Sequence, residues 1–220
     1  MEALRIKDYV TSQIDDWEVI RRVIAGEKSL FEILLRRYNQ TLYRVIRSYL
    51  KDQDEIQDAM QNAYLKAFEK LYQFQGNSSF STWLIRIGIN EALLRLRALQ
   101  REKLQMIDSV SEHIMNRMPD KQLNAEKAIM QREAKQILES AIDSLPEKYR
   151  VVYMLKEIEN LSNTEMAESL GLSDANVKVR LHRAKALLKE SLYKLSSTRD
   201  IFEFGKHNCD AMVQRVMNAI

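Results

Sequence analysis

The sequence predicts an all-α protein built from two small helical domains joined by a flexible linker. Only five Gly and two Pro occur in 220 residues, so few positions would interrupt a helix. Apolar residues recur at the 3.6-residue spacing of amphipathic helices, and no stretch alternates as a strand does. The length suits two domains better than one. We place the domains at residues 1–100 and 124–195, with a linker at 101–123 and a tail at 196–220.

Charge and cysteine content narrow the class of protein. The net charge is only +3, so any affinity for nucleic acid must come from local clusters of basic residues. The single cysteine, Cys209, excludes an internal disulfide and suits a reducing cytosol. The N-terminus lacks a signal-like apolar core, and no apolar run is long enough to span a membrane. We expect a soluble cytoplasmic protein without membrane insertion.

The first domain is expected to begin with three amphipathic helices. Asp15 and Asp16 favour the start of the first, and Gly26 ends it. An apolar stripe predicts the second helix over residues 29–50. The third covers residues 52–71, and its outer surface is acidic early on.

A polar loop and a basic helix complete this domain. The loop Tyr72–Ser79 has the sequence YQFQGNSS, and Ser79 or Ser81 can cap the helix that follows. Arg86 and Asn90 lie on the polar face of that helix. Aromatic rings that stack on bases and cations that hold phosphates are typical of sites for single-stranded nucleic acid. An ordinary polar face on a bundle helix explains the same residues equally well.

The second domain is predicted to contain a helix-turn-helix. Helices are expected from about Asn124 to Leu145 and, after Pro146, over residues 147–158. Ser162 and Glu165 then form a capping box, Gly171 ends that short helix, and Ser173 caps the next. Two capped amphipathic helices joined by a Gly turn define the motif.

The second helix of this motif carries the clearest functional signal. Between Ser173 and Lys194 it has six basic and two acidic residues. Small, polar and basic side chains near a helix N-terminus suit the DNA major groove. A solvated basic face on a bundle helix is the simpler alternative. The residues expected on the outward face are Asn176, Lys178, Val179, His182 and Arg183.

The sequence contains no pattern that predicts catalysis or cofactor binding. It has no Ser/His/Asp set, no paired carboxylates in a cleft pattern and no Gly-rich phosphate loop, so we expect no enzyme activity and no cofactor. A metal site at His207 and Cys209 would need at least two more ligands, and we expect none. The apolar stripe Met212–Ile220 in the tail is expected to pack on the protein itself or on a partner.

Taken in order, three blocks resemble the sigma factors of bacterial RNA polymerase, in the extracytoplasmic-function (ECF) class of the sigma-70 family. The resemblance covers residues 15–195. It is strongest at DAMQNAYLKAF (58–68), at GNSSFSTWLIRIGINEAL (76–93), and from LPEKYRVVYML (145–155) through the helix-turn-helix. The block SSFxTWLxRI before such a helix-turn-helix is highly specific, although neither half alone would be.

The resemblance implies a sigma factor that binds core RNA polymerase, directs it to specific promoters and helps to melt the DNA. The polymerase would be bound through Asp58, Gln61 and Asn62. The helix-turn-helix residues named above would read the duplex minus-thirty-five element. Asn62 stands where the family usually has Glu, and Ser81 replaces a common Arg. The residues expected at the melted minus-ten element are Tyr72, Phe74, Asn77, Arg86 and Asn90.

The expected partners are therefore core RNA polymerase and promoter DNA, both duplex and melted. The resemblance leaves open an anti-sigma factor as a further partner. The alternative function is a stand-alone helix-turn-helix transcriptional regulator whose N-terminal helices dimerise or sense a signal. Residues 54–93 separate the two hypotheses, because a sensor domain has no reason to carry SSFxTWL next to a basic helix.

Overall fold

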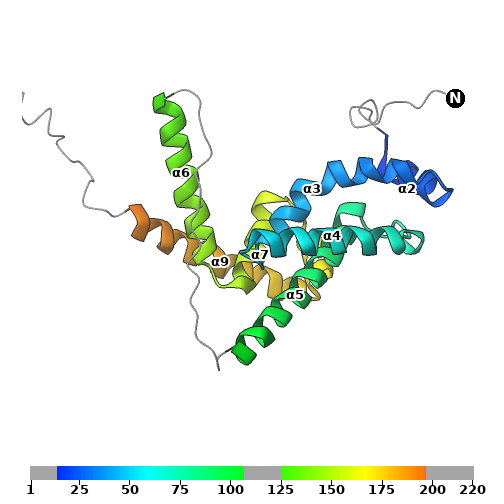
Figure 1. The fold of residues 1–220 in the computed structure, drawn as a ribbon. Coiled ribbons are helices and arrows are strands. Elements are labelled where there is room, and N and C mark those ends of the chain that lie inside the picture. The colour runs from blue at the N-terminus through cyan, green and yellow to red at the C-terminus, as the bar shows by residue number, and fades with distance from the viewer. Residues whose placement is uncertain (1–13, 107–124, 197–220) are drawn as a thin grey trace, which may run out of the picture. The chain divides into compact units, whose positions relative to one another are not determined.

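The computed structural model of the chain describes residues 14–106 and 125–196, and every regular element in these ranges is a helix (Figure 1). The predicted all-α fold is confirmed. The tail beyond Ser196, with His207 and Cys209, lies outside the described residues, as do residues 1–13 and most of the predicted linker.

Acidic caps begin two helices of the N-terminal part. The Asp15 carboxylate accepts a hydrogen bond from the backbone N–H of Trp17 at 3.2 Å. Asp52 accepts from the N–H groups of Asp54 and Glu55 at 3.0 and 3.1 Å. Both caps satisfy donors that a helix start leaves without partners. The elements are α2 (Asp16–Ile24), η1 (Lys28–Leu30), α3 (Phe31–Arg47), α4 (Gln53–Glu69), η2 (Leu71–Gln73) and α5 (Phe80–Met106).

The predicted helix-turn-helix is present in the C-terminal part. Both hydrogen bonds of the Ser162–Glu165 capping box form, and Gly171 ends the first helix of the motif at φ 63°. The Ser173 hydroxyl accepts from the N–H of Asn176 at 3.3 Å and so caps the second. The elements are α6 (Ala125–Ser144), α7 (Glu147–Tyr153), the π-helical turn η3 (Met154–Ile158), α8 (Asn163–Leu170) and α9 (Asp174–Ser196).

The described residues form two compact units. The first contains 14–106 together with 145–185, and the second contains 125–144 together with 186–196. The first part of α9 thus belongs to one unit and its last part to the other. The domain division at residues 100 and 124 stays a prediction.

A single hydrophobic core fills the first unit. In Figure 1, α3, α4 and α5 lie side by side, and each packs on the other two. Their fully buried residues include Leu42, Ile46 and Leu84. Leu155 and Met166, from η3 and α8, belong to the same core, and α8 packs on α5.

The second unit is smaller. Ala141 of α6 and Leu188 of α9 are buried in it, and the hydroxyls of Ser144 and Ser191 are hydrogen-bonded at 2.9 Å. The apolar side chains of Ile137 and Leu138 on α6 remain 40% and 38% exposed.

Gly88 determines how closely α3 and α5 approach each other. A Cβ atom at this position would overlap Leu42 Cδ1 and lie 3.7 Å from Ile46 Cδ1. Because Leu42 is 0% exposed, its side chain has little room to move. Gly88→Ala should therefore lower the free energy of unfolding by about 1–3 kcal/mol, although Ala is the better helix former. Denaturant unfolding followed by circular dichroism measures the change.

The matched control is the same substitution in a Leu42→Ala background. In that background the added methyl group occupies the space that the Leu42 side chain has left. Gly88→Ala should therefore lower the free energy of unfolding by less than it does in the parent chain. Equal losses in both backgrounds would show that Leu42 is not the obstacle.

Candidate nucleic-acid interface

The start of α9 presents the predicted recognition residues to solvent. Val177 and Ala184 are buried and fix the inward face of the helix. The side chains on the outward face, all exposed, are those of Asn176, Lys178, Val179, His182 and Arg183. Val179 is 52% exposed and adds an apolar side chain to this face. This face offers amide, cationic and apolar groups within two helical turns.

Arg183 is held in place by α7. Its Nη1 donates to the hydroxyl of Tyr149 at 3.4 Å, and this contact lowers the pKa of that phenol. The Tyr149 ring lies under the ammonium of Lys148, 5.1 Å from its centroid. A guanidinium has five N–H donors, so the remaining ones can meet an acceptor such as a base edge.

The loop before α5 has one exposed and one buried aromatic ring. Tyr72 is 70% exposed, and Asn77 is exposed as well. Phe74, which the sequence grouped with them, is only 8% exposed. Its ring packs against Trp17, Phe80 and Trp83 at centroid distances of 5.9, 5.8 and 5.5 Å. Phe74 therefore anchors the loop in the core.

A pocket of about 420 Å³ opens between this loop and the start of α2. Trp17 forms one side and is 49% exposed. Its ring lies 3.3 Å from the position of a Cβ on Gly76, so a larger residue in the loop would press on it. The lining residues are Asp15, Asp16, Trp17, Phe74, Gln75, Gly76, Ser78, Ser79 and Phe80.

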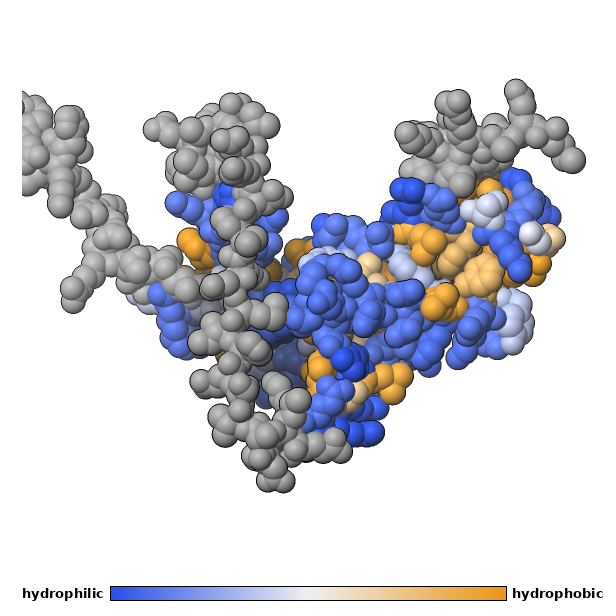
Figure 2. Space-filling model, in the orientation of Figure 1, coloured by the Kyte–Doolittle hydropathy of each residue, from blue (hydrophilic) through white to orange (hydrophobic). Residues whose placement is uncertain are grey.

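No sequence pattern predicts the contribution of α2 to this pocket. Asp16 is tied to the bundle, because its carboxylate accepts from the Arg37 guanidinium and the Tyr38 hydroxyl. Burial and the bond to Asp16 raise the pKa of Tyr38 above its ordinary value. Asp15 and Trp17 stand some sixty residues from the loop in sequence, so no local pattern links them. Figure 2 shows hydrophobic residues at the surface around α2, where Ile24 is 52% exposed.

The basic face of α5 is less cationic than its sequence suggests. Arg86 and Asn90 are exposed, as predicted. Arg95 instead pairs with Glu55 of α4, donating from Nη2 at 2.6 Å, and lies 3.5 Å from Glu102. The guanidinium lowers the pKa of the Glu55 carboxyl. Arg95 is therefore largely neutralised.

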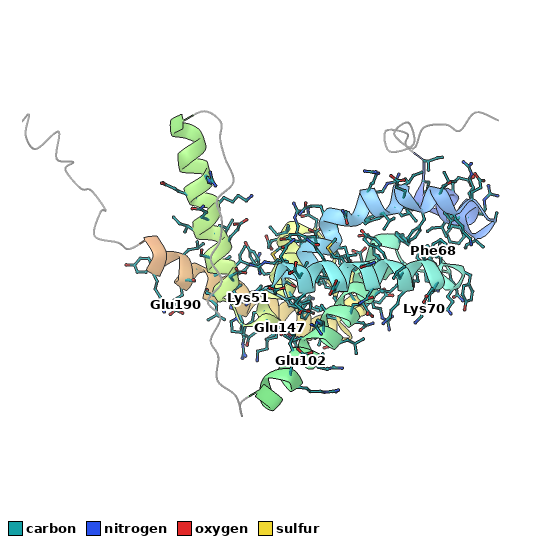
Figure 3. All side chains as sticks on the ribbon, viewed as in Figure 1. Lys51, Phe68, Lys70, Glu102, Glu147 and Glu190 are labelled. Atoms are coloured by element: carbon teal, nitrogen blue, oxygen red, sulfur yellow. The ribbon has the colours of Figure 1, made fainter. Side chains whose placement is uncertain are left out.

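The outer face of α4 carries the residues expected to contact a protein partner. Asp58, Gln61 and Asn62 are all exposed, at positions i, i+3 and i+4 of one helix face. Leu65, at i+7, extends this face and is 54% exposed. Lys51 and Lys70, labelled in Figure 3, lie at the two ends of the helix.

Within residues 14–106 and 125–196, no helix is both long and apolar enough to cross a membrane. Across the same residues, no three His, Cys, Asp or Glu side chains gather as metal ligands do.

Two family descriptions match the chain. Sigma-70 region 2 matches residues 34–102, which hold the α4 face, the loop and α5. Sigma-70, region 4 matches residues 135–188, which hold the helix-turn-helix.

Curated relatives match along most of their length. The RNA polymerase sigma-H factor of Pseudomonas aeruginosa is 31% identical over 188 residues, which cover 84% of this chain and 97% of that protein. The ECF RNA polymerase sigma-E factor of Escherichia coli K12 is 30% identical over 189 residues, covering 84% and 98%.

Solved structures share the fold. CnrH, in complex with the cytosolic domain of CnrY, matches with a TM-score of 0.58 and 24% identity over 83% of this chain and 99% of that one. The sigma factor RpoE of Bartonella quintana, in complex with the anti-sigma factor NepR, matches with a TM-score of 0.59 and 24% identity over 76% and 98%.

The two aromatic residues of the loop should respond differently to truncation. Phe74→Ala removes a ring packed against three others and should destabilise the chain by about 3–5 kcal/mol. Tyr72→Ala removes an exposed ring and should change stability by less than about 0.5 kcal/mol. Thermal unfolding of the two variants measures the difference, and similar melting temperatures for both would contradict the burial of Phe74.

Proposed function

We propose that three surfaces of this chain, which belongs to the extracytoplasmic-function class of the sigma-70 family, have separate roles in transcription initiation. As a sigma factor, the chain binds core RNA polymerase and directs it to promoters. The assignment of each task to particular residues is the part that we propose.

The α4 face is the proposed polymerase contact. Asp58, Gln61 and Asn62 lie within two turns of the half-exposed Leu65 on the same helix face, so the face combines polar groups with one apolar side chain. Interfaces that form and dissociate commonly have this composition. Asn62 contributes an amide where the family resemblance implies a carboxylate, so this contact depends less on charge than it would with Glu at that position.

The exposed face of α9 is the proposed reader of the minus-thirty-five element. A rigid, capped helix can enter the major groove of duplex DNA with its first turns facing the bases. Asn176 and Arg183 are the side chains suited to base edges, and Val179 can contact a thymine methyl group. Lys178 is placed to hold a phosphate.

The proposed binding of the minus-ten element rests on the pocket beside the Tyr72–Ser79 loop. A base that leaves the stack costs a few kcal/mol to unpair, and the cost is offset when an aromatic side chain stacks on it. Trp17 is the exposed ring that lines the pocket, and Ser78 and Ser79 offer hydrogen bonds there. Tyr72 and Asn77 are exposed on the same loop, outside the pocket lining. Arg86 and Asn90 on α5 would follow the strand backbone. We therefore add Trp17 to the residues predicted from the sequence.

The remaining inferences follow from the family. We infer that this chain has no catalytic activity of its own and acts in the cell interior, where it meets the polymerase. CnrH and RpoE are seen bound to the CnrY domain and to NepR, which supports an inhibitory protein of that kind as a partner here. The stand-alone regulator is not favoured, because residues 34–102 match sigma-70 region 2. Run-off transcription with core polymerase on genomic fragments tests the function as a whole.

Arg183→Ala should weaken binding to the cognate minus-thirty-five element by about 1–3 kcal/mol and relax the preference at one base position. The control is Lys189→Ala, which removes an exposed charge from a later turn of α9. Holoenzyme binding to a set of singly substituted promoters measures both. An equal loss on every sequence would mean that Arg183 only contacts phosphate.

Trp17→Ala and Asn77→Ala should reduce open-complex formation on duplex promoters while leaving polymerase binding unchanged. A pre-melted bubble should restore most of the activity, because strand opening no longer has to be driven by base capture. Asp58→Arg is the matched control. It should weaken polymerase binding, and the bubble should not rescue it. If the bubble does not restore the activity of Trp17→Ala, the pocket has no role in the melting step.

A further inference from the structure

Arg183 is held by an uncharged partner, whereas its neighbour Lys185 is held by an acid. The Lys185 ammonium lies 2.8 Å from a carboxylate oxygen of Glu157. A carboxylate that holds a cation also offsets the attraction of that cation for phosphates and base edges. The Arg183 guanidinium instead donates to the hydroxyl of Tyr149 at 3.4 Å. This bond restrains the guanidinium and leaves its charge available to DNA.

Tyr149 is itself fixed at the start of α7. It is 9% exposed, and its backbone N–H donates to the carbonyl of Pro146 at 2.9 Å. The next residue, Arg150, is 7% exposed and donates from Nη2 to the carbonyl of Leu145 at 2.8 Å. A backbone bond and a side-chain bond therefore hold this turn, and the phenol hydroxyl has a defined position.

The orientation of Arg183 depends on α7 as well as on α9, because the bond joins residues 34 positions apart in the sequence. An exposed Arg side chain populates many rotamers, and a contact with DNA has to overcome the loss of that freedom. A bond that is formed before DNA arrives removes part of this loss, since the guanidinium already lies near one orientation.

The bond to Tyr149 leaves the guanidinium able to make a two-point contact. It uses one hydrogen of Nη1, so it does not occupy the N–H donors of Nε and Nη2. Two donors side by side on an Arg match the O6 and N7 acceptors that guanine presents in the major groove. Adenine, cytosine and thymine do not present two adjacent acceptors there. Guanine is therefore the base that suits a guanidinium held in this way.

We propose that Tyr149 is a positioning residue for promoter recognition, whose hydroxyl holds the Arg183 guanidinium so that its Nε and Nη2 donors meet a guanine of the minus-thirty-five element. Tyr149 acts through Arg183 and makes no contact with the base itself. This inference rests on the proposed role of α9 as the reader of that element. It adds that a residue outside the helix-turn-helix sets part of the specificity, and that the base selected is guanine.

Tyr149→Phe removes the hydroxyl and keeps the ring, so the packing of α7 is preserved. The measurement is holoenzyme binding to four promoters that differ only at the base pair whose preference Arg183→Ala relaxes. The preference for guanine there should fall about three- to tenfold, because the guanidinium is present but no longer held. The dependence of affinity on salt concentration should stay that of the parent chain, since no phosphate contact is lost.

Two controls separate positioning from stability. Tyr153→Phe makes the same change one turn further along α7 and should leave the preference unchanged. In an Arg183→Ala background, Tyr149→Phe should have no further effect on the preference, because the side chain that it positions is gone. A uniform loss of affinity on all four promoters, together with a lower melting temperature, would mean that Tyr149 only stabilises the fold.

The restraint on Arg183 can also be measured without DNA. In the free chain, the NMR order parameter of the Arg183 Nε–H bond should be lower in Tyr149→Phe than in the parent, since the hydroxyl no longer restrains the guanidinium. An order parameter that the substitution leaves unchanged would overturn the inference. An unchanged preference in Tyr149→Phe, or a parent chain that prefers another base at this pair, would overturn it too.

Failure of the proposed function would look different. If Arg183→Ala leaves every base preference intact, Arg183 does not read the promoter and the proposed role of this residue is wrong. If Arg183→Ala relaxes the preference whereas Tyr149→Phe does not, the role of Arg183 stands and only the positioning by Tyr149 is lost.

Discussion

Helix α5 packs against three different helices, and both nucleic-acid surfaces of the first unit depend on that packing. Towards α3 and α4 it buries Leu84 and Ile85, and Gly88 lets the backbone approach Leu42. Towards α8 it presents Thr82. The remaining face, with Arg86 and Asn90, is left to solvent, so the orientation of the basic surface is fixed by what the other faces must bury.

Local features of the structure were predictable from the sequence because their causes are local. Asp52, the Ser162–Glu165 box and Gly171 act within one helical turn, so their residue types specify where helices begin and end. The outward face of α9 follows from the same periodicity that buries Val177 and Ala184.

Features set by distant residues were not predictable. Phe74 is buried because Trp17, Phe80 and Trp83 surround it, and one of those rings comes from α2. The pocket has the same origin, since no sequence pattern joins Asp15 to a loop that starts at Tyr72. Helix α5 reaches Met106, inside the segment predicted as a linker, because the loss of apolar periodicity after residue 100 does not itself stop a helix.

The ion pairs show why counting basic residues overstates a nucleic-acid surface. Arg95 is held by Glu55, and Lys185 lies 2.8 Å from Glu157. Glu165 has its pKa lowered, first by the backbone N–H of Ser162, and in its ionised form it also accepts from Thr82. One carboxylate thus caps the start of α8 and joins two parts of the chain.

The π-helical turn η3 makes the spacing of this region sensitive to chain length. A π turn holds one residue more than an α turn, and η3 lies between α7, anchored by Arg150, and the helix-turn-helix. Deleting one residue from Met154–Ile158 and winding the rest as an ordinary α-helix would leave the direction of the chain nearly unchanged, because four α-helical residues turn about as far as five π-helical ones. Any other insertion or deletion here would turn α9 by about 100° per residue, even where every side-chain substitution is tolerated, so length changes other than that one should be rare in this stretch among functional variants.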